Sequence, residues 1–324
     1  MLPLLPLLRR LRVPLFVVGA ALGTALAIRA VAVDAYRIPT SSMEPALLPG
    51  DLVLVEKWTL GARVPSLLGG GRLPGLGSLQ RGDVAVFDRP QRGGGEAGET
   101  AYVKRIVGLP GDTVAIRGGV LFVNGDPFRP APTLRDWAVH TALSPDAAPV
   151  REAGCAPPGC TVRERMAPGR WRVAATDEAI GQVQAALGIA PVSAAPAAGA
   201  PLFPLGRPQT LDDYGPVVVP GRAAPVPLGE TTWPYVRETL ERYEGTTARR
   251  DPYGRFAVGG LAVTQARFRR DYVFVLGDNR HGSADSRHFG FVPADALVGR
   301  VDLVAFSWDG RGALRASRIG RRVR

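Results

Sequence analysis

Lysine is nearly absent from this 324-residue chain. Lys57 and Lys104 stand among 40 basic residues, so arginine carries almost all of the formal charge of +11. Such a skew is typical of genome-wide codon bias, which weakens any argument that the charge was selected for binding nucleic acid. Arginine stays protonated at working pH and therefore cannot accept a proton. Of the two basic residue types, only lysine can take part in proton transfer.

Cysteine and histidine are also scarce, with two and three copies. These numbers leave little room for a metal site or a disulfide scaffold, and we expect no metal ion and no organic cofactor. Cys155 and Cys160 flank an Ala-Pro-Pro-Gly turn that could join the two sulfurs in an oxidising compartment. Closing so short a loop would contribute about 2 kcal/mol in the chain-entropy model. Two reduced thiols in a flexible loop are the alternative.

Long helical patterns are missing from most of the chain, because 40 glycines and 30 prolines interrupt it. The hydrophobic content of 46% is nevertheless sufficient for a core. Short runs rich in Val, Ile and Phe, separated by turns, predict a mostly β protein with a strongly bent antiparallel sheet or barrel. These runs are 51–56, 83–87, 101–107, 113–117, 120–123, 272–276 and 298–307.

One long apolar run is present, at residues 13–33. Its 21 residues suffice for one membrane crossing if Arg29 extends toward the headgroups. Arginines precede the run within residues 1–12 and the first acid follows it, so the positive-inside rule places the N-terminus in the cytoplasm. The alternatives are a cleaved signal peptide that ends near residues 30–32, or a buried core helix.

The remaining chain divides into a core, an insertion and a tail. We predict a catalytic β core in two parts, 34–126 and 271–310, separated by an inserted accessory region at 127–270 that is rich in Ala and Pro. The tail, 311–324, carries six arginines and would either contact anionic lipid or be solvated. A Gly- and Pro-rich segment, 61–80, predicts a loop, with a membrane-surface segment as the alternative.

Three segments carry residues suited to chemistry. Ser42 follows the predicted span in a hydroxyl cluster bracketed by two prolines, where a pre-shaped turn could present a nucleophile. Lys104 lies within an apolar β-type run, and burial there would lower its pKa toward neutrality. A dense polar segment, 277–291, follows the last apolar run but one. Each signal alone is weak, since proline-flanked hydroxyls are usually turns and edge-strand lysines usually guard against aggregation.

A Ser/His/Asp arrangement is the alternative for the third segment. His281 could pair with Asp285 or Asp278. Known triads seldom take the base and its orienting acid from one loop four residues apart, so this arrangement is disfavoured.

Together, the three segments closely resemble bacterial signal peptidase I, the leader peptidase family. The resemblance covers residues 36–51, 81–87, 102–112, 277–293 and 314–320, which occur in the family's order behind an N-terminal span. It implies a serine endopeptidase in which Ser42 is the nucleophile and Lys104 the general base. Thr40 takes the position of the hydroxyl that helps the Ser42 backbone N–H bind the oxyanion.

The resemblance also implies supporting roles. Ser283 would orient the lysine, and Asp285 and Arg287 would form a structural pair near the site. Two shallow pockets for small side chains at substrate positions −1 and −3 would be lined by Tyr36, Ile38, Pro39, Leu47, Val86, Tyr102 and Val103. Ser41 stands where the family usually has glycine, and the insertion has no counterpart that we can assign.

The sequence therefore predicts a monomeric, single-pass enzyme of the bacterial inner membrane, with its catalytic domain on the outer, periplasmic face. Its partners would be exported preproteins and the lipid bilayer, with no nucleic acid. One rival is a binding module that kept the fold and lost activity. Another is a self-cleaving Ser/Lys repressor that binds DNA, but no helix-turn-helix is visible at the N-terminus.

Overall fold

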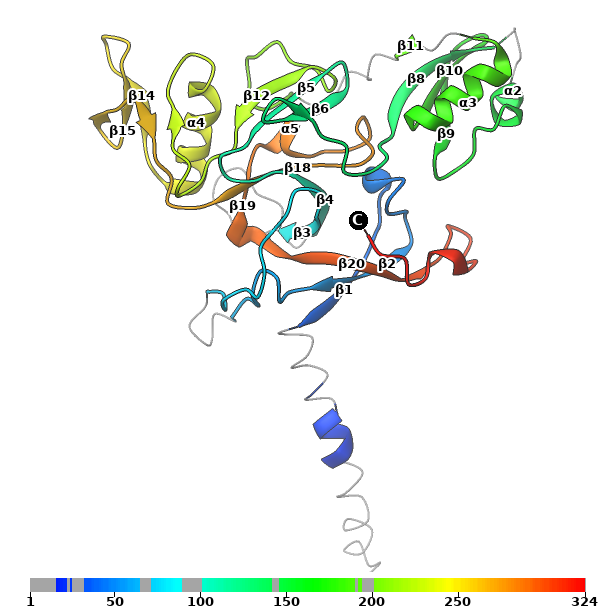
Figure 1. The fold of residues 1–324 in the computed structure, drawn as a ribbon, viewed down its shortest axis with the longest axis horizontal. Helices are drawn as coiled ribbons and strands as arrows, with labels where there is room; N and C mark the ends of the chain where they lie inside the picture. The colour runs from blue at the N-terminus through cyan, green and yellow to red at the C-terminus, as the bar shows by residue number, and fades with distance from the viewer. Residues whose placement is uncertain are drawn as a thin grey trace, which may run out of the picture.

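We determined a computed structural model of the chain, shown in Figure 1, which describes residues 16–21, 24, 32–64, 71–88, 101–141, 146–189, 192–193 and 201–323. The predicted span at 13–33 lies largely outside these residues. Within the described parts, no helix is both long and apolar enough to cross a bilayer.

The main sheet joins the two ends of the folded chain. Its strands are antiparallel and follow the order β1-β2-β20-β3-β4-β18-β19. They are β1 (Val33–Arg37), β2 (Asp51–Glu56), β20 (Leu297–Ser307), β3 (Val84–Asp88), β4 (Ala101–Gly108), β18 (Tyr272–Leu276) and β19 (Val292–Pro293). Because β20 pairs between β2 and β3, the C-terminal part of the chain completes a sheet that the N-terminal part begins.

A second antiparallel sheet has the order β12-β5-β6-β7. Its strands are β12 (Tyr214–Val218), β5 (Thr113–Arg117), β6 (Val120–Val123) and β7 (Asp126–Pro127). The turn between β6 and β7 contains Asn124 and Gly125, whose φ angles are 56° and 93°. Both values lie in the left-handed region, which asparagine and glycine tolerate best, so this dipeptide closes the hairpin.

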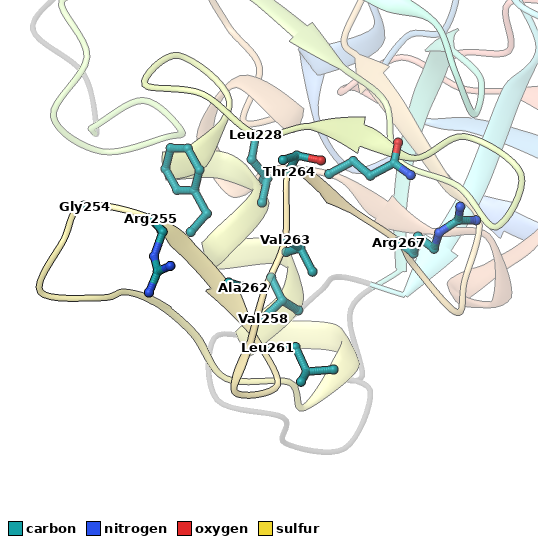
Figure 2. Close-up of a pocket in the computed structure, with 11 residues that line it drawn as sticks. Leu228, Gly254, Arg255, Val258, Leu261, Ala262, Val263, Thr264 and Arg267 are labelled. Atoms are coloured by element: carbon teal, nitrogen blue, oxygen red, sulfur yellow. The ribbon is translucent and has the colours of Figure 1, made fainter.

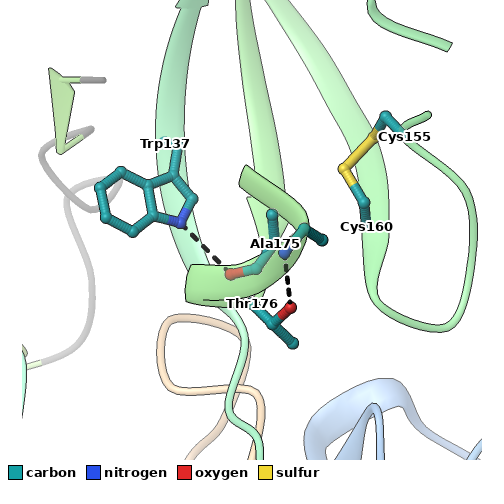
Figure 3. The surroundings of a disulfide bond; sticks show 6 residues. Trp137, Cys155, Cys160, Ala175 and Thr176 are labelled. Carbon is teal, nitrogen blue, oxygen red and sulfur yellow. Dashed lines mark hydrogen bonds between the residues drawn. A yellow bond between two sulfur atoms is a disulfide. The ribbon is translucent and has the colours of Figure 1, made fainter. Parts of the chain in front are cut away.

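Part of the region 127–270 forms a sheet with two helices packed near it, coloured green in Figure 1. The strand order is β11-β8-β10-β9. The elements are β8 (Arg135–His140), α2 (Ala148–Glu152), β9 (Cys160–Ala167), β10 (Arg170–Ala175), α3 (Asp177–Leu187) and β11 (Val192–Ser193). We call these elements the accessory sheet. Cys155 and Cys160 form a disulfide at the start of β9, as Figure 3 shows.

The rest of this region forms smaller elements on the opposite side of Figure 1. They are β13 (Val226–Pro227), α4 (Trp233–Thr239), a π-helical turn η3 (Leu240–Glu244), β14 (Ala248–Arg250), β15 (Phe256–Val258), β16 (Leu261–Ala262) and β17 (Gln265–Ala266). Short helices elsewhere are η1 (Ser41–Met43), α5 (Ser286–Phe289), η4 (Ala294–Ala296) and η5 (Ala316–Arg318).

The prediction of a mostly β protein with antiparallel sheets is confirmed. Four predicted runs, 51–56, 113–117, 120–123 and 272–276, coincide with β2, β5, β6 and β18. Runs 101–107 and 298–307 are one residue shorter than β4 and β20, and run 83–87 is shifted by one residue relative to β3. The described parts of segment 61–80 contain neither helix nor strand, as predicted. Buried and partly buried residues alternate along most of β2, which explains why its sequence pattern predicts a strand.

Two apolar clusters support the main sheet next to the candidate site. One contains Ile38, Met43 and Leu47 together with valines of β2, β3 and β20. The other contains Ile106 with Val273 and Val275 of β18. These side chains are almost fully buried, so the backbone segments that carry the functional groups have rigid support.

Candidate active site

Ser42 lies in η1, a single 3₁₀ turn that follows β1. The turn is closed by the Glu44 N–H, which donates to the Ser41 carbonyl at 3.0 Å. Met43 is buried in the cluster below, which leaves Ser42 partly exposed on the other side. The Thr40 hydroxyl donates to Ser42 Oγ at 3.3 Å. The sequence thus folds locally so that an apolar neighbour anchors the turn and presents the hydroxyl.

Lys104 lies on β4 and contacts Ser42. Its Nζ atom is 2.8 Å from Ser42 Oγ and also donates to the Val103 carbonyl at 2.8 Å. The side chain is 3% exposed, and its Nζ lies 5.3 Å from the centre of the Tyr102 ring. Burial lowers the pKa of Lys104 to about 8, against an opposing contribution from the carboxylates of Asp285 and Asp278. A minority of this amine is therefore neutral near pH 7, and the neutral fraction grows as the pH rises toward 8.

Asn279, in the loop after β18, ties that loop to the serine turn. Its backbone N–H donates to the Ser42 carbonyl at 3.1 Å, and its side-chain amide donates to the Ser41 carbonyl at 3.1 Å. Two hydrogen bonds from one residue fix the orientation of the peptide planes around the hydroxyl. The loop at 277–285 is thus the support on which the turn rests.

Two buried ion pairs hold this loop in place. Arg105 of β4 binds both carboxylate oxygens of Asp278, at 2.8 and 2.7 Å. Arg287 binds both oxygens of Asp285, at 2.9 and 2.8 Å, so these two residues do form the predicted pair. Burial alone would raise the pKa of Asp285, but the Arg287 guanidinium and the contact with His288 hold it well below its usual range.

A cavity of 270 Å³ opens beside Ser42 and Lys104. Five of the seven residues predicted to bind substrate line it, namely Tyr36, Ile38, Pro39, Tyr102 and Val103. Leu47 and Val86 are not among its lining residues. They are fully buried in the same cluster as Ile38, where they support the wall from behind.

Ser283 lies close to the serine turn without contacting the lysine through a hydrogen bond. Its Oγ is buried and has no hydrogen-bond partner among the described residues. A side chain at Gly277 would collide with it, because a Cβ there would lie 2.2 Å from Ser283 Oγ and 2.5 Å from the Ser42 carbonyl oxygen. Glycine at this position lets the two segments approach. The lysine-orienting role of Ser283 stays a prediction.

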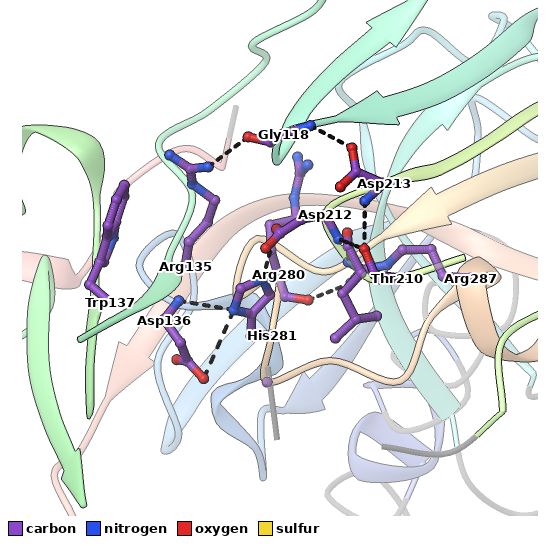
Figure 4. Close-up of polar contacts among 12 residues, drawn as sticks. Gly118, Arg135, Asp136, Trp137, Thr210, Asp212, Asp213, Arg280, His281 and Arg287 are labelled. Carbon is purple, nitrogen blue, oxygen red and sulfur yellow. Dashed lines mark hydrogen bonds and ion pairs between the residues drawn. The ribbon is translucent and has the colours of Figure 1, made fainter. Parts of the chain in front are cut away.

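His281 is engaged elsewhere, as Figure 4 shows. Its Nδ1 accepts from the Asp136 backbone N–H at 3.0 Å, and its Nε2 lies 2.9 Å from Asp212 Oδ1. Both ring nitrogens are therefore occupied by the accessory sheet and by the segment before β12. The arrangement favours a structural role and gives no support to the Ser/His/Asp alternative.

Sequence reasoning missed the supporting residue Asn279 and its neighbour in space, Arg163. Arg163 of β9 donates to Asn279 Oδ1 at 2.9 Å and lies 3.1 Å from Asp136 Oδ1. The polar density of segment 277–291 could have pointed to Asn279. No local signal marks Arg163, because its partner is 116 residues away and its strand belongs to a region without a recognisable motif.

Comparison with known proteins gives a consistent result. The sequence model of a family described as "Signal peptidase, peptidase S26" matches residues 11–157 and 231–306. The chain is 41% identical over 102 residues to the signal peptidase I of Pseudomonas aeruginosa, covering 31% of this chain and 34% of that protein. It is 30% identical over 131 residues to that of Bacillus licheniformis, covering 39% of this chain and 60% of the relative.

The matches are partial. The chain is also 39% identical over 102 residues to the signal peptidase I of Pseudomonas fluorescens, covering 31% of this chain. The chain spans about a third of the length of each of the two Pseudomonas proteins. The family match also omits residues 158–230, which include β9, β10 and α3 of the accessory sheet.

Proposed function

The chain belongs to the signal peptidase family, peptidase S26, and we propose that it is a membrane-anchored serine endopeptidase that removes signal peptides from exported preproteins. The observation that carries this proposal is the 2.8 Å contact between Ser42 Oγ and the buried amine of Lys104. A hydroxyl becomes a nucleophile when a neighbouring base accepts its proton, and a lysine with a lowered pKa can do so.

In the proposed reaction, Ser42 Oγ attacks the carbonyl carbon of the −1 residue while Lys104 Nζ accepts the serine proton. The Ser42 backbone N–H and the Thr40 hydroxyl stabilise the oxyanion. The C–N bond then breaks, and the departing amine takes the proton from Lys104. Lys104 next accepts a proton from water, whose oxygen attacks the acyl carbon. The bond from that carbon to Ser42 Oγ then breaks, Oγ takes the proton from Lys104, and the signal peptide leaves with a free carboxyl group.

The substrate is proposed to bind as an extended strand beside the 270 Å³ cavity. Alternate side chains of such a strand point the same way, so those at −1 and −3 would face the enzyme. The cavity walls include Ile38, Tyr102 and Val103, and Leu47 and Val86 back them. These apolar, closely packed walls favour small side chains.

We further propose that residues 13–33 anchor the enzyme in the bacterial inner membrane, with residues 1–12 in the cytoplasm and the catalytic domain on the periplasmic face. The arginines before the run support this topology. Exported preproteins and the bilayer are the proposed partners of a monomeric enzyme that uses no cofactor. Residues 34–126 and 271–310 would form its catalytic core, 127–270 an accessory region and 311–324 a basic tail.

The pH dependence of cleavage tests the proposed base. Lys104 must be neutral to accept the Ser42 proton, and its pKa of about 8 means that protonation removes the base at lower pH. We expect kcat/KM for a model preprotein to rise about tenfold per pH unit below that value and to level off above it. The measurement uses the full chain in a non-ionic detergent.

A Ser42→Ala variant is the control and should show no cleavage at any pH. An ascending limb centred near 6.5, the usual pKa of histidine, would instead indicate a histidine base. Absence of any cleavage by the intact chain would favour the rival interpretation, a binding module that kept the fold and lost activity.

Substrate choice at −1 provides an independent prediction. Replacing Ala at −1 of the model preprotein by Phe should lower kcat/KM at least about 100-fold, because several added carbon atoms must fit against packed walls at about 1 to 3 kcal/mol each. Phe at −2, whose side chain would point away from the enzyme, is the matched control and should change kcat/KM only a few-fold. Equal losses at both positions would contradict the assignment of the cavity.

A further inference from the structure

A second cavity, away from Ser42, is marked by a buried arginine that has no hydrogen-bonded partner among the described residues. Arg280 is 5% exposed, and its side chain makes no hydrogen bond or ion pair with the described residues, while its buried Nε is an unsatisfied donor. The backbone is fixed, because the Arg280 N–H donates to the Leu134 carbonyl at 2.8 Å and its carbonyl accepts from Arg287 at 2.5 Å. The backbone of Arg280 is thus fixed, while its guanidinium makes no hydrogen bond to a described residue.

The two buried carboxylates of this loop already bind other arginines. Three buried arginines, Arg105, Arg280 and Arg287, meet two buried aspartates in this loop. Asp278 gives both oxygens to Arg105, and Asp285 gives both to Arg287. Both carboxylates attract the charge of Arg280, but neither makes a hydrogen bond to its guanidinium among the described residues.

A buried charge without a hydrogen-bonded partner is costly, so such groups are normally paired directly. Burial lowers the pKa of Arg280 to about 10, and the neighbouring Arg287 contributes in the same direction. Figure 4 shows Arg280 among the paired groups of this region, beside His281 and Arg287. The arginine remains protonated at neutral pH, and the loop residues that the structure describes give its guanidinium no direct hydrogen-bond partner.

Arg280 lines a cavity of 430 Å³ between the turn of β5 and β6, the segment before β8, and the start of α3. Two further arginines line it, of which Arg135 is held by Asp177 at 2.7 Å and by the Gly118 carbonyl at 3.1 Å. Arg129 is exposed at the rim. With Asp177 and Glu178 on the other side, the lining carries three positive and two negative charges, which matches one negative charge on a ligand.

The remaining walls are apolar and include Leu121, Phe128 and Pro130. A ligand with one carboxylate and an apolar body would satisfy both the guanidinium and these walls, whereas a bare multivalent anion would not. We propose that this cavity is a binding site for a small organic carboxylate, held by the Arg280 guanidinium.

A larger cavity elsewhere lacks this feature. Its volume is 760 Å³, it lies beside β15 and β16, and Figure 2 shows the side chains that line it, most of which are apolar. Its Arg255 is already bound to Asp251 at 2.6 Å and is largely exposed. Arg255 is an exposed, paired arginine beside a cavity. Its substitution therefore serves as a matched control for unspecific anion binding.

The test measures binding of benzoate to the full chain in a non-ionic detergent by its effect on Tm. A ligand that binds only the folded state raises Tm in a saturable way. We expect benzoate to do so relative to sodium chloride of equal ionic strength, and benzamide, which has the same body without the charge, to have no effect. An equal shift with benzamide, or none with benzoate, would overturn the proposal.

Variants locate the site. Arg280→Met should abolish the benzoate shift, and Arg255→Met should leave it unchanged. Should Arg280→Met not fold, Ala131→Phe, which fills the cavity from a partly exposed lining position, must abolish the shift as well. Retention of the shift in a folded Arg280→Met or in Ala131→Phe would overturn the assignment. Ser42→Ala should bind benzoate normally, so the outcome is independent of the proposed peptidase activity.

Discussion

Lys104→Arg is expected to lower kcat/KM for a model preprotein by at least about 100-fold, the scale of losing a general base. The substitution keeps the charge and most of the side-chain length, but guanidinium stays protonated at any working pH and cannot accept the Ser42 proton. Cleavage rates and circular dichroism of the same preparations separate loss of chemistry from loss of fold.

The chain offers one other lysine as a matched control. A lysine that follows the predicted strand 51–56 with no motif around it is expected to face solvent, but the side chain of Lys57 is largely buried and forms an ion pair with Asp34 at 3.4 Å. Arginine can form the same pair, so Lys57→Arg should change kcat/KM less than twofold. If Lys104→Arg kept more than a tenth of the activity, the barrier would have risen by under about 1.4 kcal/mol, and the Ser42/Lys104 mechanism would have to be abandoned.

Asp278→Asn should lower the free energy of unfolding by about 3–5 kcal/mol, because it leaves the buried Arg105 guanidinium without its counter-charge. Both side chains of this pair are almost inaccessible, and the two bonds are shorter than 3 Å. Denaturant unfolding of the full chain in detergent, followed by circular dichroism, measures the change at constant slope.

Asp295→Asn is the matched control. Asp295 pairs with Arg270 at 3.2 Å on the surface, where such pairs contribute about 0–1 kcal/mol. Similar losses for the two variants would show that burial does not set the strength of the Asp278 pair.

In addition, the Asp278 carboxylate raises the pKa of Lys104, so its neutralisation should move the ascending limb of the pH profile to lower pH.

The candidate site was predictable to the extent that it depends on local patterns. The local patterns around Ser42 and Lys104 were weak by themselves, and the resemblance of three segments taken together assigned their roles. Asp285 and Arg287 were paired because they lie two residues apart on one loop. Leu47 and Val86 were placed on the cavity wall by resemblance, but the packing of β2, β3 and β20 puts them behind it. Whether a side chain lines the cavity or lies behind its wall depends on which other strands pack around it. A local sequence pattern carries no information on that packing.

What the sequence by itself determined is the set of strands and turns, because the alternation of side chains along a strand and the demands of a turn act over a few residues. Only the tertiary structure decided which groups meet. The order of strands in the main sheet brings Lys104 to Ser42 across 62 positions and Arg105 to Asp278 across 173. It also buries Arg280 without a hydrogen-bonded partner in the part of the chain that the structure describes, since Asp278 and Asp285 give their oxygens to Arg105 and Arg287.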